Sequence, residues 1–122
     1  MKDLATFTHL IHGKGFFEAI AAGVEDWEAL LDKRERPAFD NAWGSAFEAL
    51  REMSYQNPMA EADVTSLREF AFKAMFRLTE DADIAAYVCD DIGLIADALV
   101  KGLVSSHCDQ LLASYKAGIF PC

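Results

Sequence analysis

The sequence predicts an all-α protein, an irregular bundle of about six helices that forms a single domain over residues 1–122. Three observations predict this class. Apolar residues recur at helical spacing over most of the chain. No five consecutive positions keep the alternation of a strand. The three prolines and seven glycines are sparse and separate the helical patterns. A chain of this length can bury one core.

The first part of the chain contains four helical patterns. The first runs from about Asp3 to His12 and the second from Phe16 to Ala22. Asp26 can cap the third, which ends before Pro37. Pro37 suits the first turn of the fourth helix, because a proline there lacks only an amide hydrogen that has no partner. That helix carries the clearest core stripe of the chain: Phe39, Ala42, Trp43, Ala46, Phe47, Leu50 and Met53.

The next helix is expected to follow a loop over residues 56–63 that Asn57-Pro58 marks. Ser66 and Glu69 fit a capping box at its start, with Asp63 as the alternative start. Most of its surface is apolar, which predicts a central place in the fold. Its expected inner face consists of Val64, Leu67, Ala71, Met75 and Leu78.

Two more helices complete the expected bundle. One is capped by Asp81 or Thr79 and ends at Gly102. The last spans about residues 104–117, and residues 119–121 are expected to fold back onto the body. The side chains that the last helix should bury are Val104, Cys108, Leu111, Leu112 and Tyr115.

The charge balance excludes several classes of partner. Twenty acidic and 11 basic residues give a net charge of −9, which disfavours phosphate backbones and anionic membranes as partners. No apolar run is long enough to span a bilayer, and the start of the chain lacks the apolar region of a signal peptide. The three cysteines belong to no CxxC pair and fit free thiols in a reducing compartment. The sequence therefore predicts a cytoplasmic protein with no nucleic-acid or membrane partner.

The helix that ends at Gly102 carries the most distinctive charge pattern. From Glu80 to Val100 there is no Lys or Arg, and the six carboxylates are Glu80, Asp81, Asp83, Asp90, Asp91 and Asp97. At 100° per residue Asp83, Asp90 and Asp97 fall on one side, and Asp91 flanks them. The opposite side is the expected core face, formed by Ile84, Val88, Ile92, Ile95 and Leu99.

Tyr87 and Leu94 lie on the acidic side of this helix. Apolar anchors with a charged rim are typical of a binding surface for a basic protein. The predicted partner-binding residues are therefore Asp83, Tyr87, Asp90, Asp91, Leu94 and Asp97. The alternative is that another helix covers Tyr87 and Leu94 and the carboxylates are merely solvated. A homo-oligomer that pairs through them is disfavoured by repulsion between the two acidic copies.

No motif in the sequence indicates catalysis. His9 and His12 are three residues apart on a helix, a spacing that could hold a metal ion, but no acidic or thiol ligand is paired with them locally. Cys108 falls on a core stripe, which favours a buried structural thiol. We expect no enzyme activity, no metal and no cofactor. A small metal-binding protein or enzyme that uses His9 and His12 is retained as an alternative.

Small size, all-α character, acidity, the expected cytoplasmic location and the missing catalytic motif together resemble the immunity proteins of bacterial toxin–immunity pairs. The resemblance implies an inhibitor that binds a cognate toxin domain, often a basic nuclease, and occludes its active site. It is general, and it assigns no functional residue. The segments 90–96 and 114–118 are similar to stretches of small bacterial proteins of unassigned function. The alternative inhibitor is a nucleic-acid mimic that blocks a DNA- or RNA-binding protein.

Overall fold

The computed structural model describes residues 3–122. These residues form seven α-helices and no strand, so the predicted all-α class is confirmed. The helices are α1 (Leu4–Ile11), α2 (Phe16–Ala22), α3 (Trp27–Arg34), α4 (Pro37–Arg51), α5 (Pro58–Thr79), α6 (Ala82–Lys101) and α7 (Ser106–Lys116).

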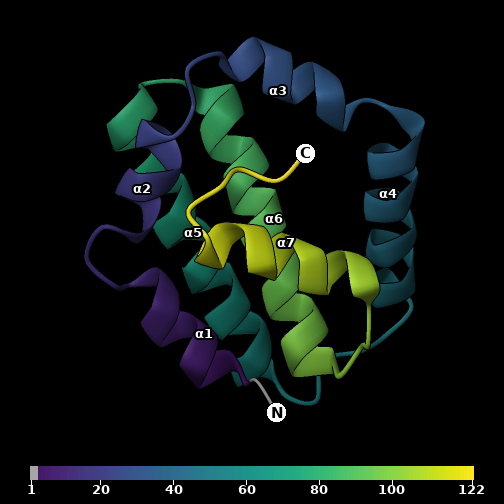
Figure 1. The fold of residues 1–122 in the computed structure, drawn as a ribbon. Coiled ribbons are helices and arrows are strands. Elements are labelled where there is room, and N and C mark those ends of the chain that lie inside the picture. Colours follow the sequence, from purple (N-terminus) through teal and green to yellow (C-terminus); the bar gives the residue numbers. More distant parts are fainter. Residues whose placement is uncertain (1–2) are drawn as a thin grey trace.

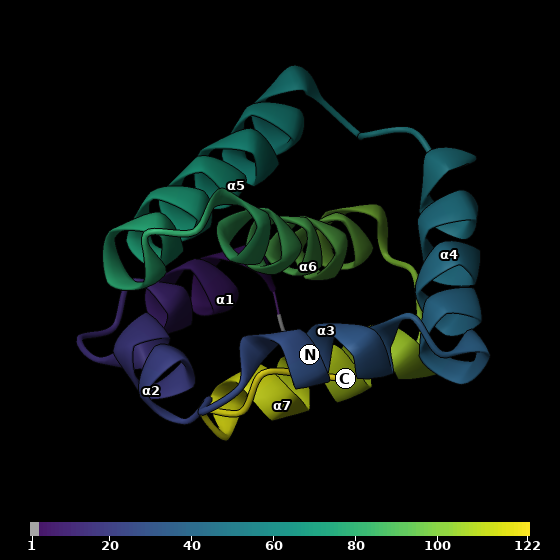
Figure 2. The ribbon, with the colours of Figure 1, turned by 90° about the horizontal axis from the view of Figure 1, so that it is seen from above.

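Helix α6 runs through the centre of the molecule (Figure 1). It forms a hairpin with α5, and α3 and α7 lie on the side opposite α5 (Figure 2). Helices α1 and α2 flank the bundle on one side and α4 flanks it on the other. The residues after α7 pass between α7 and α3, as the predicted folding back requires. This arrangement leaves α6 surrounded by neighbours.

The middle of α6 is buried on every side. All residues from 91 to 96 are buried, not only those on the predicted core face. Gly93 allows this close packing on the side that faces α5. A Cβ at position 93 would lie only 2.7 Å from Cδ of Arg68 on α5. Without a side chain there, Arg68 can pass directly over α6. A helix that is buried all round is a central helix, and α6 has that place in the fold.

Short polar side chains start most of the helices. Asp26 accepts a hydrogen bond from the amide of Ala29, and Asp81 accepts bonds from the amides of Asp83 and Ile84. Both caps and the place of Pro37 at the start of α4 agree with the sequence-based predictions. Gly102 ends α6 in the left-handed conformation, also as predicted.

Two boundaries were predicted wrongly. Residues 58–63 are not a loop, because α5 begins at Pro58 with Asn57 as its N-cap. Asn-Pro is a turn signal, but the same pair also provides a good cap and a good first helical residue. Ser66 and Glu69 consequently lie inside the helix. Helix α7 begins at Ser106 with Ser105 as its cap, and Val104 is 94% exposed in the preceding loop.

One core contains the buried apolar side chains of the described residues. Ala46 and Leu50 are the buried residues that α4 contributes to this core. Phe47 is 44% exposed and stacks on the half-buried Trp43. Helix α4 flanks the bundle, so only part of its predicted stripe is covered. No helix formed by residues 3–122 has both the length and the apolar character that a bilayer crossing demands.

Candidate partner-binding site

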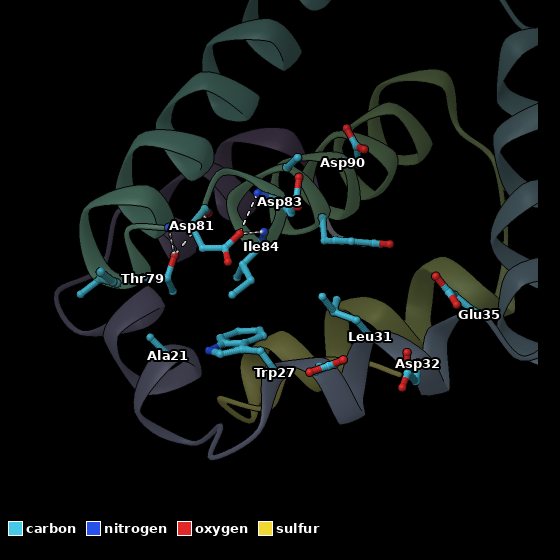
Figure 3. Close-up of a pocket in the computed structure, with 14 residues that line it drawn as sticks. Ala21, Trp27, Leu31, Asp32, Glu35, Thr79, Asp81, Asp83, Ile84 and Asp90 are labelled. Atoms are coloured by element: carbon cyan, nitrogen blue, oxygen red, sulfur yellow. Dashed lines mark hydrogen bonds between the residues drawn. The ribbon is translucent and has the colours of Figure 1, made fainter.

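A cleft of about 1120 Å³ opens between α3 and the first half of α6 (Figure 3). The end of α5 closes one side of it through Leu78 and Thr79. No Lys or Arg is among the described residues that line it, and six carboxylates are: Glu28, Asp32, Glu35, Asp81, Asp83 and Asp90. Three come from α3 and its C-cap and three from α6 and its N-cap. We call this feature the acidic cleft.

The floor of the acidic cleft is apolar. Trp27 and Leu31 reach from α3 toward α6, where Ile84 lies opposite (Figure 3). Tyr87 is half-buried and also lines the cleft. The Trp27 ring is held edge-on by Phe120 at a centroid distance of 5.0 Å. The cleft thus combines an apolar floor with acidic walls on two helices.

Asp81 and Asp90 are held in place by internal contacts. Asp81 Oδ1 caps α6 at 2.9 and 3.1 Å from two amide nitrogens. Asp90 Oδ1 lies 2.9 Å from Nη2 of Arg68. Burial raises the pKa of Asp90 and the nearby charge of Asp91 adds to this, while Arg68 opposes the shift. Low-dielectric walls that carry one sign of charge focus the field inside such a cleft.

Asp91, although predicted to bind a partner, is 0% exposed and belongs to the interior. Its carboxylate accepts two hydrogen bonds of 2.7 Å from the guanidinium of Arg34 on α3. Trp43 Nε1 on α4 donates at 2.9 Å and the Tyr115 hydroxyl on α7 at 2.6 Å. Four hydrogen bonds satisfy both oxygens. Asp91 therefore ties three helices to α6, and its expected place on the surface was wrong.

Arg34, the partner of Asp91, is also buried. Its guanidinium lies 4.6 to 5.2 Å from the ring centroids of Phe39, Tyr87 and Phe120, and it donates to the Pro121 carbonyl at 3.1 Å. Burial by itself would lower the pKa of Arg34, but the hydrogen bonds and charge of Asp91 raise it above its ordinary value. Burial and the charge of Asp91 raise the pKa of Tyr115 well above its usual value.

The other two predicted residues lie away from the acidic cleft. Leu94 is buried, 4% exposed, because the core covers α6 on this side as well. Asp97 is 24% exposed and accepts a hydrogen bond of 2.6 Å from Tyr55. Burial and that hydrogen bond raise the pKa of Tyr55 to about 12. Asp83, Tyr87 and Asp90 are therefore the predicted residues that the structure brings together.

The α3 wall was missed at the sequence level. Glu28, Asp32 and Glu35 are spaced by four and three residues, so they share one face of a helix. That spacing was a usable signal. What sequence could not supply is that this face stands opposite α6 across a cleft.

The two histidines considered as metal ligands are exposed. The His12 ring stacks on Phe70 at 3.9 Å, and its Nδ1 lies 2.9 Å from the carbonyl oxygen of Thr8. Within residues 3–122, no three His, Cys, Asp or Glu side chains are grouped so that they could hold a metal ion. The geometry therefore gives no support to the metal-binding alternative.

Comparison with known proteins identifies the family. No curated protein matches the chain. A family model described as Immunity protein PIM1 matches residues 6–122, a range that contains both walls of the acidic cleft and the whole set of contacts around Asp91. The resemblance to bacterial immunity proteins is thereby confirmed, and such a protein has a cognate toxin as its partner. The chain belongs to the family of PIM1 immunity proteins.

Proposed function

We propose that this immunity protein neutralises its toxin by binding a basic surface of the toxin in the acidic cleft, without catalysing a reaction. The observation that carries the proposal is the pair of facing acidic walls over an apolar floor. Lys and Arg side chains of the toxin would pair with the walls, and an apolar side chain would contact Trp27, Leu31 and Tyr87. Buried aromatic anchors with a charged rim are the common composition of tight interfaces.

The charge of the cleft also favours rapid capture of a toxin. Complementary charge accelerates association, and added salt reduces this acceleration. A nuclease fits the proposal well, because a surface that binds phosphates is basic. Covering such a surface would block the nuclease active site by steric exclusion. Asp83, Tyr87 and Asp90 are the members of the predicted site that this proposal retains.

The nucleic-acid-mimic alternative is less consistent with this geometry. A mimic must project its carboxylates outward to enter a groove built for a duplex. Here six carboxylates line a concave surface instead. The shape favours insertion of a segment of the partner into this protein, rather than insertion of this protein into the partner.

The test compares two double variants with equal change of charge. Binding of the toxin domain encoded beside the gene is measured for Asp83→Lys/Asp90→Lys and for Glu48→Lys/Glu69→Lys, whose exposed positions lie outside the acidic cleft. We expect the first pair to weaken binding by about a hundredfold and the second to have a much smaller effect. Equal losses in the two variants would place the interface elsewhere. An unchanged toxin mass after incubation is expected of an inhibitor that performs no reaction.

A further inference from the structure

We infer that the buried Arg34–Asp91 pair is a positioning device of the acidic cleft. It fixes α3, and with α3 one of the two acidic walls, at a defined place opposite α6. The inference rests on the proposed role of the cleft in binding the toxin. Arg34 and Asp91 act through the surface residues that they position, and neither is itself part of the contact surface.

The other attachments of helix α3 to the core are made by side chains that are only partly buried. Among its eight described residues Arg34 is the one that is buried, whereas Trp27, Leu30 and Leu31 are half-buried. The backbone hydrogen bonds around its ends are local to α3 and the start of α4. An isolated helix of this length is unstable in water, so tertiary contacts must hold it.

Arg34 supplies such a tertiary contact and also fixes the orientation of α3. Two hydrogen bonds of 2.7 Å join its guanidinium to the Asp91 carboxylate. A paired fork of this kind fixes orientation as well as distance. Trp43 and Tyr115 hold Asp91 in turn, so the carboxylate that anchors α3 is itself immobilised by α4 and α7.

The same guanidinium reaches the lining of the acidic cleft. It lies 5.2 Å from the ring centroid of Tyr87, which forms part of the floor. Glu35 follows Arg34 directly and Asp32 precedes it by two residues, so both wall carboxylates move with the Arg34 backbone. On the other side, Phe120 contacts both Arg34 and Trp27. One buried side chain therefore sets the wall and part of the floor together.

A fixed wall strengthens binding because the partner then loses less free energy in ordering it. Lysine keeps the positive charge but has neither the planar fork nor the stacking surface of arginine. Arg34→Lys should therefore keep the pairing of charge and lose the orientation. We expect α3 to become loose while the α5–α6 hairpin remains intact.

The test measures toxin binding and backbone hydrogen exchange for Arg34→Lys. We expect about tenfold weaker binding, with faster exchange in α3 but not in α5 and α6. Ile11→Ala is the matched control, since Ile11 is buried on α1 and lines no part of the cleft. Ile11→Ala should lower stability without this local change. If Arg34→Lys fails to fold, Tyr115→Phe replaces it, because this change removes one hydrogen bond that immobilises Asp91 and alters no residue that lines the cleft.

Unchanged exchange in α3 would overturn the inference. Where the cleft variants do weaken toxin binding, a loss of binding in Arg34→Lys no greater than that of Ile11→Ala would overturn it too. The exchange measurement does not involve the toxin. A failure of the cleft variants to alter toxin binding would therefore refute the proposed function, while exchange in α3 would still decide whether Arg34 positions the wall.

Discussion

Tyr115 on α7 donates its hydroxyl hydrogen at 2.6 Å to Oδ2 of Asp91, the same oxygen that Nη1 of Arg34 approaches to 2.7 Å. One carboxylate oxygen thus joins α7 and α3 at the centre of the molecule. Because both donors and the acceptor are buried, the stability of the fold depends on all three groups being present.

Asp91→Ala should lower the free energy of unfolding by about 3–5 kcal/mol, because it leaves Arg34 buried without its counter-charge. Tyr115→Phe should cost about 1.5–3 kcal/mol, the value of a hydrogen bond to a charged group. The double variant should cost less than the sum, since both changes act on one network. Urea unfolding measures all three, with Asp32→Ala as an exposed control expected to change stability by less than about 0.5 kcal/mol. An Asp91→Ala variant as stable as this control would contradict the assignment.

Substitutions at the C-terminal ends of α5 and α6 are expected to change the stability of the fold in opposite directions. Glu80, the C-cap of α5, has φ of 55°, a left-handed conformation that is unfavourable for a residue with a Cβ. Glu80→Gly should therefore raise stability by about 0.5–1 kcal/mol. Gly102 has φ of 73° at the matching position of α6, and Gly102→Ala should lower stability by about 1 kcal/mol. Thermal unfolding compares the two variants, and shifts of the same sign would be inconsistent with this explanation.

Because His107 is partly buried, we expect the fold to lose stability in mild acid. Its Nε2 is buried with no hydrogen-bond partner among residues 3–122, and its ring meets Phe39 edge-on at 5.0 Å. Burial lowers the pKa of His107 below its ordinary value of 6.5. As the pH falls through that value, the unfolded chain gains a proton that the folded chain does not bind, so the free energy of unfolding decreases.

The measurement is urea unfolding between about pH 7 and about pH 5. His107→Phe should lose stability less steeply over this range than the unmodified protein, because it lacks the titrating group. His9→Gln removes an exposed histidine and serves as the control. A slope in His107→Phe that matches that of the unmodified protein would show that other groups cause the acid sensitivity.

Periodicity predicted most of the helices well, because every helix except α3 has buried apolar side chains in the core. It was less reliable at the ends. Asn57-Pro58 serves as a turn signal and equally as a cap followed by a first helical residue, and only the tertiary structure selects between them. Val104 was assigned to a core face by its spacing, but its backbone precedes the cap of α7.

Only part of the candidate site was predicted from the sequence, and the reason is related. A helical projection gives the direction of a side chain but not the neighbour that it meets. Asp90 and Asp91 are adjacent, yet Asp90 is exposed and lines the acidic cleft, whereas Asp91 is enclosed by α3, α4 and α7. The far wall of the cleft belongs to α3, more than forty positions earlier in the chain. No pattern within α6 could indicate it.

Residues of the acidic cleft and of the interior beneath it differ in how freely they can be substituted. Glu28, Asp32 and Asp83 take part in no ion pair within residues 3–122, so substitutions there would alter the surface proposed to bind the toxin and leave the interior as it is. Replacing either Arg34 or Asp91 by a neutral residue would leave the other charge buried without its partner. If a toxin acquires a new arrangement of basic residues, single substitutions of the cleft carboxylates could restore the complementarity of charge. The buried pair would meanwhile keep the scaffold constant, so divergence in specificity need not pass through an unstable intermediate.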